Sequence, residues 1–305
     1  MKQEVVPILS LSEKEKRFFE TSFTWEPHSR NLHKQFHINK LEGVIEHMNF
    51  PLPPHRQTVN DFVFLTSGES IRSKGLDKYV FSTDTFFFLP AYQISTHELM
   101  SADAKGYYCH FDNEIFTCKW LKPDILAEFS FLQFTGNPLV TVEADSRKHL
   151  LTILEHLESE YSPDANYNLD VIRVNILSLL MEVKRFAKQE KVTENAALRI
   201  AQQYKNKLSR FIYEKSTVAE YASMLSVSPN HLNKCVKATT GKSAQELLSE
   251  MILLEAKVML KQTNLSISEI AFQVGRNEIS DFVRFFKSKT GISPGEYRKM
   301  VNPEV

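Results

Sequence analysis

The sequence predicts an α+β protein, in which a β-barrel or sandwich with two following helices precedes an all-α domain. Three observations support this. Short aromatic, strand-like runs fill the first half, two amphipathic helical stripes follow, and the last hundred or so residues repeat one helical unit. We place the first domain at residues 1–186, a polar linker at 187–197 and the second domain at 198–305.

Composition sets the class of protein. The chain has 305 residues, of which 42% are hydrophobic and 24% charged, as expected for about two ordinary globular domains. The formal net charge is zero, but residues 195–305 hold 16 Lys and Arg against 10 Asp and Glu, whereas residues 1–194 hold 21 against 27. A basic C-terminal third is typical of a domain that binds a polyanion, although chance sorting of surface charge also explains an excess of this size.

Location and redox state follow from what the sequence lacks. No stretch approaches the roughly 18 apolar residues of a membrane span, and the charged N-terminus does not resemble a signal peptide, so we expect a cytoplasmic protein without membrane contact. Cys109, Cys118 and Cys235 form no CxxC pair. They are expected to be reduced thiols, neither a disulfide framework nor a zinc site.

Two segments near the C-terminus repeat the same pattern. Glu220 aligns with Glu269 at an offset of 49, whereas Lys237 aligns with Lys287 at an offset of 50. The change in offset indicates one extra residue in the turn between the two helices of the second unit. The same helical unit is therefore predicted twice.

Both units have recognisable helix starts. Thr217 and Glu220 have the spacing of a capping box, and Ser266 and Glu269 repeat it. In the first unit, Ser228 followed by proline predicts the start of a second helix after a short turn. A short helix, a turn and a second helix form a helix-turn-helix.

The second helix of each unit is expected to present amide and basic side chains to solvent. These residues are Asn230, His231, Asn233, Lys234 and Lys237 in the first unit, and Ser280, Asp281, Arg284 and Lys287 in the second. Asparagine can form two hydrogen bonds with adenine, while lysine and arginine reach guanine or phosphate. A plain helical bundle with a solvated polar face is the alternative for one unit alone, and the duplication disfavours it.

A third capped helix is predicted between the two units, at residues 243–262. Twenty residues span about 30 Å. Successive major grooves on one face of a DNA duplex are about 34 Å apart. One chain would therefore be able to place both second helices in neighbouring grooves.

These residues carry a resemblance to a known family. Residues 195–299, and above all ISEIAFQVG followed by FVRFFKSKTGISPGEYRK, resemble the C-terminal domain of the AraC/XylS class of transcription regulators. The resemblance implies sequence-specific binding to double-stranded DNA, with activation as the commoner outcome and RNA polymerase as a partner. It also places Ile279, Ser280, Val283 and Arg284 along the second reading helix.

The second unit departs from the family pattern. Arg276 stands where the family usually has Phe, and Ile279 where Gln is common. Glu278 and Asp281 bring negative charge close to the expected phosphates, and repulsion weakens such contacts. We therefore expect the first unit to supply most of the base reading.

The first half is predicted to be β-structure. VNDFVFLTSGE, KYVFSTDTFFFLPA and GYYCHFDNEIF are strand-like runs separated by Gly, Asp and Pro. PPHRQTVNDFVFLTSG followed by DTFFFLPAYQIS resembles the two motif halves of a cupin, the usual sensor domain of this family. The resemblance implies a cupin-like β-barrel that binds a small-molecule effector.

A catalytic metal site is not expected in such a barrel. His55 stands where the first ligand of a cupin would lie, but Gln57 and Ser95 occupy the other positions. We therefore expect no metal and no cofactor, and we take the other histidines as surface or packing residues. Aromatic side chains are candidates for lining an effector pocket, although packing in the core explains them equally well: Phe62, Phe64, Phe86, Phe88 and Tyr92.

Two amphipathic helices are predicted at residues 146–161 and 169–187. In the family the corresponding helices form the dimer contact, so the resemblance implies a homodimer. Packing of the apolar stripes within one chain is the alternative.

Two other classes of function compete with a regulator. One is an enzyme, either a cupin oxygenase or isomerase or a DNA-repair alkyl-acceptor protein with the same tail. The broken histidine set disfavours the former, and the absence of a four-cysteine cluster disfavours the latter. The other is a pure interaction module, which leaves the basic C-terminal region unexplained.

Overall fold

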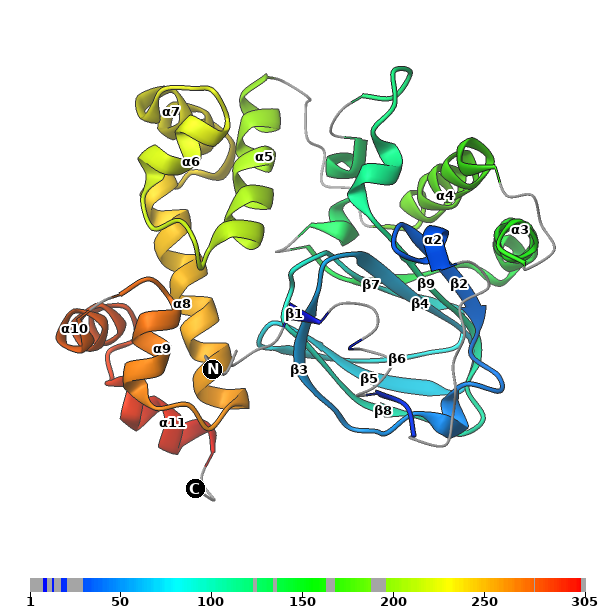
Figure 1. Ribbon diagram of the computed structural model, residues 1–305, viewed down its shortest axis with the longest axis horizontal. Helices are drawn as coiled ribbons and strands as arrows, with labels where there is room; N and C mark the ends of the chain where they lie inside the picture. Colours follow the sequence, from blue (N-terminus) through cyan, green and yellow to red (C-terminus); the bar gives the residue numbers. More distant parts are fainter. Residues whose placement is uncertain are drawn as a thin grey trace. The chain divides into compact units, whose positions relative to one another are not determined.

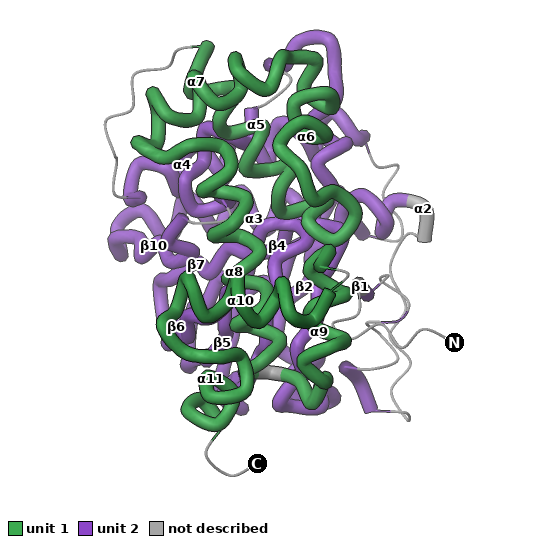
Figure 2. The backbone as a smooth tube through the Cα atoms, turned by 90° about the vertical axis from the view of Figure 1, so that its left-hand side faces the viewer, with its two compact units in different colours: residues 1–7, 192–305 green, residues 8–191 purple. Residues whose placement is uncertain are grey.

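The computed structural model describes residues 8–9, 13, 18–20, 30–122, 125–133, 136–162, 168–187, 196–276 and 278–302. The chain divides into two compact units, residues 8–191 and 192–305, which are coloured separately in Figure 2. Most of the predicted linker, residues 188–195, lies outside the described residues.

The first unit contains two five-stranded sheets. The first sheet has the order β1 (Ile8–Leu9), β3 (Leu52–Gln57), β8 (Ser95–Met100), β5 (Glu69–Lys74) and β6 (Asp77–Ser82). The second has the order β10 (Leu139–Thr141), β7 (Thr85–Leu89), β4 (Asn60–Ser67), β9 (Lys105–Phe111) and β2 (Phe36–Lys40). The three strand-like runs of the sequence become β4, β6 with β7, and β9, as predicted.

The two sheets do not close into the predicted barrel. No strand of one sheet is hydrogen-bonded to a strand of the other within the described residues. The sheets instead meet face to face through apolar side chains such as Val63 and Leu65 from β4, Phe87 from β7 and Met100 from β8. The sandwich is therefore the correct form of the predicted β-domain, because side-chain packing rather than edge pairing joins its sheets.

The second sheet is buried on both faces. Along β4, Val63 and Leu65 point toward the first sheet, while Phe62 and Phe64 point the other way, as the two-residue period of a strand requires. The opposite face is covered by α3 (Ala144–Glu160) and α4 (Leu169–Lys184), as Figure 1 shows. Short segments complete the unit: α2 (Arg30–His33) and the 3-10 turns Ile45–His47, Asn113–Phe116, Ile125–Glu128 and Ser130–Leu132.

The apolar stripes of α3 and α4 are used within one chain. Leu154 and Leu157 of α3 and Ile176 and Leu179 of α4 are completely buried in the same cluster as Phe62. Intramolecular packing is therefore the correct interpretation of these stripes. The outward side of α4 is different, because Val174 and Met181 are exposed on it.

The second unit is helical throughout. Its helices are α5 (Ala196–Phe211), α6 (Val218–Met224), α7 (Pro229–Thr240), α8 (Ala244–Gln262), α9 (Ile267–Gln273), α10 (Ile279–Thr290) and α11 (Pro294–Val301). Figure 1 shows α8 running between two groups, with α6 and α7 toward one end and α9, α10 and α11 toward the other. The turn from α9 to α10 is one residue longer than that from α6 to α7, as the change in offset predicted.

Both turns begin with the same backbone conformation. Ser226 and Gly275 have φ angles of 55° and 75°. The next residue then reaches back, so that the N–H of Val227 donates to the carbonyl of Ala222 at 3.0 Å and the N–H of Arg276 donates to that of Ala271 at 2.8 Å. Each of these hydrogen bonds joins the N–H of one residue to the carbonyl five positions earlier. They end α6 and α9 and set the direction in which the following helix starts.

We predict opposite effects for two glycine substitutions in this unit. Gly275→Ala should lower the free energy of unfolding by about 1 kcal/mol, because its positive φ strains any residue with a Cβ. Gly295→Ala in α11 should raise it by roughly 0.5 kcal/mol, because alanine favours helix and a Cβ there meets nothing within 4 Å. Urea unfolding, monitored by circular dichroism, measures both free energies. Equal effects of the two substitutions would contradict the different conformations assigned to Gly275 and Gly295.

The structure also bears on the expectations for the cysteines and for membrane-spanning helices. Cys109, Cys118 and Cys235 are free thiols, as predicted. No helix in the described part of the chain has the length and apolarity needed to cross a bilayer.

Candidate DNA-binding helices and an interior pocket

Both helix-turn-helix units start with the predicted capping box. The side chain of Thr217 accepts from the N–H of Glu220, and that of Ser266 accepts from the N–H of Glu269. Each glutamate accepts in return from the cap, and these hydrogen bonds hold the pKa of Glu220 and Glu269 below its usual value. The same box begins α8 at Ser243, so local sequence fixes where these helices begin.

The second helix of the first unit, α7, separates its side chains as predicted. Ser228 caps it, Pro229 occupies its first turn, and Leu232, Cys235 and Val236 are buried. Four of the five predicted DNA-binding residues are exposed: Asn230, His231, Lys234 and Lys237. The Nε2 atom of His231 lies 3.6 Å from the sulfur of Cys235, which orients the ring along the helix.

Asn233 has a structural contact that its sequence position did not reveal. It is half-buried, and its Oδ1 accepts from the N–H of Ala244 at 3.0 Å. Ala244 is the first residue of α8, so Asn233 satisfies an N–H group that the helix itself leaves without a partner. A two-point contact with adenine uses both the amide oxygen and the amide N–H, and this oxygen already accepts one hydrogen bond within the protein.

The second helix of the second unit, α10, carries its charges in a different way. Ser280 and Lys287 are exposed as expected, and Ile279 is exposed as well. Arg284, however, forms an ion pair with Asp281 one turn earlier. Arg276 lies over the ring of Phe285, with 4.5 Å between the guanidinium carbon and the ring centroid. Arg276 and Arg284, which could offset the negative charge of Glu278 and Asp281, therefore both have contacts within the helical unit.

Four of the five predicted effector-binding aromatics lie in the core beneath the helices. They are completely buried in the cluster that contains α3 and α4: Phe62, Phe64, Phe86 and Phe88. Tyr92 is half-buried, and its backbone carbonyl accepts from Arg56 at 2.7 Å. None of the five lines a pocket that the described residues form between the sheets.

This pocket of about 80 Å³ lies among the inward-facing residues of the two sheets. One part of its wall is apolar and includes Leu41, Met48, Val63 and Met100. Another part is polar and contains Arg72, Tyr108 and five histidines: His33, His37, His55, His97 and His110.

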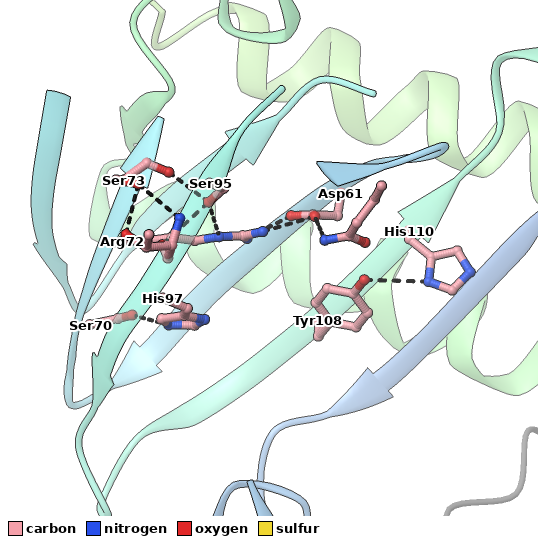
Figure 3. A network of polar contacts seen from close by, with 10 residues as sticks. Asp61, Ser70, Arg72, Ser73, Ser95, His97, Tyr108 and His110 are labelled. Carbon is pink, nitrogen blue, oxygen red and sulfur yellow. Dashed lines mark hydrogen bonds and ion pairs between the residues drawn. The ribbon is translucent and has the colours of Figure 1, made fainter. Parts of the chain in front are cut away.

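A buried ion pair joins the two sheets beside this pocket (Figure 3). The guanidinium of Arg72 in β5 donates to both oxygens of Asp61 in β4, at 2.6 and 2.9 Å. Ser95 accepts from its Nε, and the side-chain amide of Gln57 donates to Asp61. Both charged side chains are almost inaccessible, with exposed fractions of 4% for Arg72 and 0% for Asp61.

The histidines of the pocket have defined contacts. His97 lies 2.8 Å from the hydroxyl of Ser70, and Tyr108 lies 3.4 Å from His110, as Figure 3 shows. The Nδ1 of His55 donates to the carbonyl of Pro53 at 2.8 Å. No group of three or more His, Cys, Asp or Glu in the described ranges has a geometry that fits a metal ion.

The polar lining of the pocket was not predicted, because its residues come from six separate elements. His33 and His110 are 77 positions apart and belong to α2 and β9. One signal was available, since Asp61 stands directly before the apolar run Phe62–Leu65 of a buried strand and Arg72 lies 11 residues further along. A buried carboxylate requires a partner, and the next strand supplied it.

Comparison with known proteins agrees with the helical architecture. Residues 221–300 match the model of a helix-turn-helix domain. The chain is 24% identical over 263 residues to the transcriptional activator RhaS of Salmonella paratyphi A, covering 81% of this chain and 87% of RhaS. It is 22% identical over 270 residues to the regulator YfiF of Bacillus subtilis, covering 87% and 84%.

Residues 221–300 form a helix-turn-helix domain of the type found in AraC-family transcription regulators.

Other similarities are restricted to part of the chain. It is 30% identical over 117 residues to the uncharacterized regulator YisR of B. subtilis, and it spans 38% of the length of that relative. It spans 43% of the bifunctional transcriptional activator and DNA repair enzyme AdaA of B. subtilis, with 34% identity over 91 residues. Among solved structures, the C-terminal domain of AraT from Geobacillus stearothermophilus is 31% identical, with 35% of this chain and 86% of that chain covered and a TM-score of 0.32.

Proposed function

We propose that the protein is a cytoplasmic transcription activator that binds specific sites on double-stranded DNA through α7 and α10. The observation that carries the proposal is the duplicated, capped helix-turn-helix, whose second helices are apolar on one side and polar on the other. On α7 the exposed side is formed by an asparagine, a histidine and two lysines, which suit base edges and phosphates.

The two helices are proposed to contribute unequally. The lysines of α7 are exposed, whereas Arg284 of α10 is paired with Asp281. An arginine that must leave a carboxylate before it reaches a phosphate gains less on binding. The first unit is therefore assigned most of the base reading, and Ile279, Ser280 and Lys287 are assigned contacts in the second groove.

We assign control of the regulator to the first unit, which would respond to a small molecule or to a partner. We propose a homodimer formed through the outward side of α4, where Val174 has an exposed fraction of 50% and Met181 one of 38%. The seven-residue spacing of Val174 and Met181 places both on one face of α4, where they would form the apolar centre of the proposed interface. RNA polymerase is the expected further partner of an activator.

The test is genome-wide footprinting with the tagged full chain. We expect reproducible sites with two half-sites per protomer spaced by about one helical turn, roughly 10 base pairs. Affinity for these sites should fall steeply with salt, because bound lysines release counterions from the phosphates. Scattered binding without a shared sequence would refute the proposal.

Two asparagines on α7 provide a sharper prediction. Asn230→Ala should lower affinity for the bound site by about tenfold, the range expected for one base contact. Asn233→Ala should instead lower the free energy of unfolding by about 1–2 kcal/mol, because the buried N–H of Ala244 loses its acceptor. Titration of labelled duplex and urea unfolding, applied to both variants, separate the two roles. If Asn233→Ala weakened DNA binding and Asn230→Ala lowered the free energy of unfolding, Asn233 would be the residue that reads the DNA.

A further inference from the structure

The exposed side of α10 differs in chemistry from that of α7. On α7 this side is polar and basic, with Asn230 and Lys234 in the first two turns. On α10 the first residue is Ile279, which has an exposed fraction of 47%. A single exposed aliphatic residue is ordinary on a protein surface, so its significance depends on its position in the fold.

Ile279 lies at the end of α10 that is expected to meet the bases. In a helix-turn-helix the second helix lies in the major groove, and residues at its N-terminal end contact the base edges. Ile279 is the first residue of α10, and Val283 lies one turn later on the same side. Ile279 is exposed and Val283 is half-buried, so the N-terminal end of α10 presents two neighbouring aliphatic side chains.

Comparison of the two units shows why position 283 can be aliphatic. The offset of 50 pairs Val283 with Asn233, and Pro294 with Ala244. In the first unit Asn233 accepts from the N–H of Ala244, the first residue of the following helix. Pro294 is likewise the first residue of α11, but proline has no N–H. The second unit therefore requires no acceptor at this position.

The polar groups on the same side of α10 offer weaker discrimination between bases. Ser280 is exposed, but a serine hydroxyl both donates and accepts, so it does not distinguish the four bases. Asp281 and Arg284 form an ion pair, which must open before either side chain meets a base edge. Discrimination at this end of α10 is therefore assigned to Ile279 and Val283.

One group in the major groove of DNA matches an aliphatic surface. All base pairs present hydrogen-bond donors or acceptors there, and thymine adds its C5 methyl group. Contact with this methyl buries apolar surface on both partners. The major-groove edges of guanine and adenine carry polar atoms, which an aliphatic side chain would cover without forming a hydrogen bond.

We propose that α10 recognises thymine through its C5 methyl group, with Ile279 and Val283 as the residues that select it. The inference rests on the proposed function and deepens it, because it assigns a base to the second half-site. The two half-sites then differ in character. One is read through hydrogen bonds by α7, and the other contains A·T pairs that α10 reads through apolar contact.

Replacement of thymine by deoxyuridine tests the proposal, because it removes the methyl group and keeps the donors and acceptors of the base. The probe is a duplex that the full chain selects from a random pool. Each thymine of this duplex is replaced singly, and titration of the labelled duplex gives the affinity. We expect one or more thymines in one half-site whose replacement weakens binding by about fourfold, the effect of burying one methyl group.

A variant assigns the methyl contact to a side chain. Ile279→Ala should weaken binding to the unmodified duplex by about fourfold or more, and deoxyuridine at the sensitive position should then cause little further loss. An effect of the methyl group on the shape of the DNA would remain in the variant, so this comparison separates the two causes. Val283→Ala should remove part of the discrimination, and it provides the same comparison if Ile279→Ala does not fold.

Met300→Ala is the matched control. Met300 is an apolar residue of α11, in the same helical unit but outside the two reading helices, and its exposed fraction is 63%. Its replacement should change neither the affinity for the duplex nor the loss caused by deoxyuridine. Circular dichroism checks the fold of each variant.

Two results would overturn the inference: tolerance of deoxyuridine at every thymine, or the same loss in the unmodified chain and in both α10 variants. A guanine preference in the second half-site that Arg284→Ala abolishes would also overturn it and assign the reading to Arg284. Failure of the proposed function is distinguishable, because the pool would then yield no shared sequence and both proposals would fall. A selected sequence that tolerates deoxyuridine refutes the thymine assignment and leaves the regulator intact.

Discussion

Replacing Asp61 by leucine is expected to lower the free energy of unfolding of the first unit by about 3–5 kcal/mol. The substitution leaves the guanidinium of Arg72 inside the sandwich with no carboxylate, although its exposed fraction is only 4%. Two hydrogen bonds to Asp61 and the one from Gln57 disappear together. Urea unfolding followed by tryptophan fluorescence measures the effect, because residues 192–305 contain no tryptophan.

The double variant provides the control. Asp61→Leu with Arg72→Leu removes both charges, so the unfolding free energy should recover by at least ~2 kcal/mol relative to Asp61→Leu alone. Asp61→Asn is a milder change that keeps the shape and one acceptor, and it serves if the leucine variant does not fold. A double variant no more stable than the single would show that the pair does not couple the sheets.

Replacing Lys234 and Lys237 together by alanine is expected to weaken binding to the specific DNA site by about 100-fold, since removing one lysine or arginine that binds DNA costs about 1–3 kcal/mol. Both lysines lie on the exposed side of α7. The slope of affinity against salt should fall by about one for each phosphate that a lysine no longer neutralises. Titration of a labelled duplex at several salt concentrations measures both quantities.

The matched substitution in the second unit should have a smaller effect. Arg284→Ala removes an arginine that is already paired with Asp281, so a loss of affinity below about tenfold is expected. Asp281→Ala should raise affinity, because it removes a negative charge and releases Arg284. A larger loss for Arg284→Ala than for Lys234→Ala would reverse the order of the two units.

The local features of the helical unit were accessible from sequence because their causes lie within a few residues. Thr217 with Glu220 and Ser266 with Glu269 specify helix starts through hydrogen bonds that span three positions. The apolar spacing places Leu232 and Val236 on one side of α7 in the same local way. The hydrogen bond between Asn233 and Ala244 spans 11 positions and was not visible in either pattern.

The β-domain was predicted less completely, for a physical reason. Apolar side chains lie on both faces of β4, so the order of residues identifies a buried strand. It does not show which face packs against the helices and which against the other sheet. Phe62 and Phe64 were thus candidates for an effector pocket, and packing placed them under α3 and α4. The prediction of a barrel was wrong for a related reason. The pattern of apolar residues along a strand does not show whether the edge strands of two sheets are hydrogen-bonded to each other.

The sequence by itself determined the two helix-turn-helix units, their caps, the extra residue in the second turn and the existence of an aromatic β-domain. Tertiary structure alone decided what lies inside that domain. Only the folding of distant strands brings Asp61 beside Arg72 and gathers His33, His37 and His110 around one pocket. Hydrogen bonds between neighbours in sequence can be read from spacing, whereas packing between strands depends on register and layer order, which the whole chain sets.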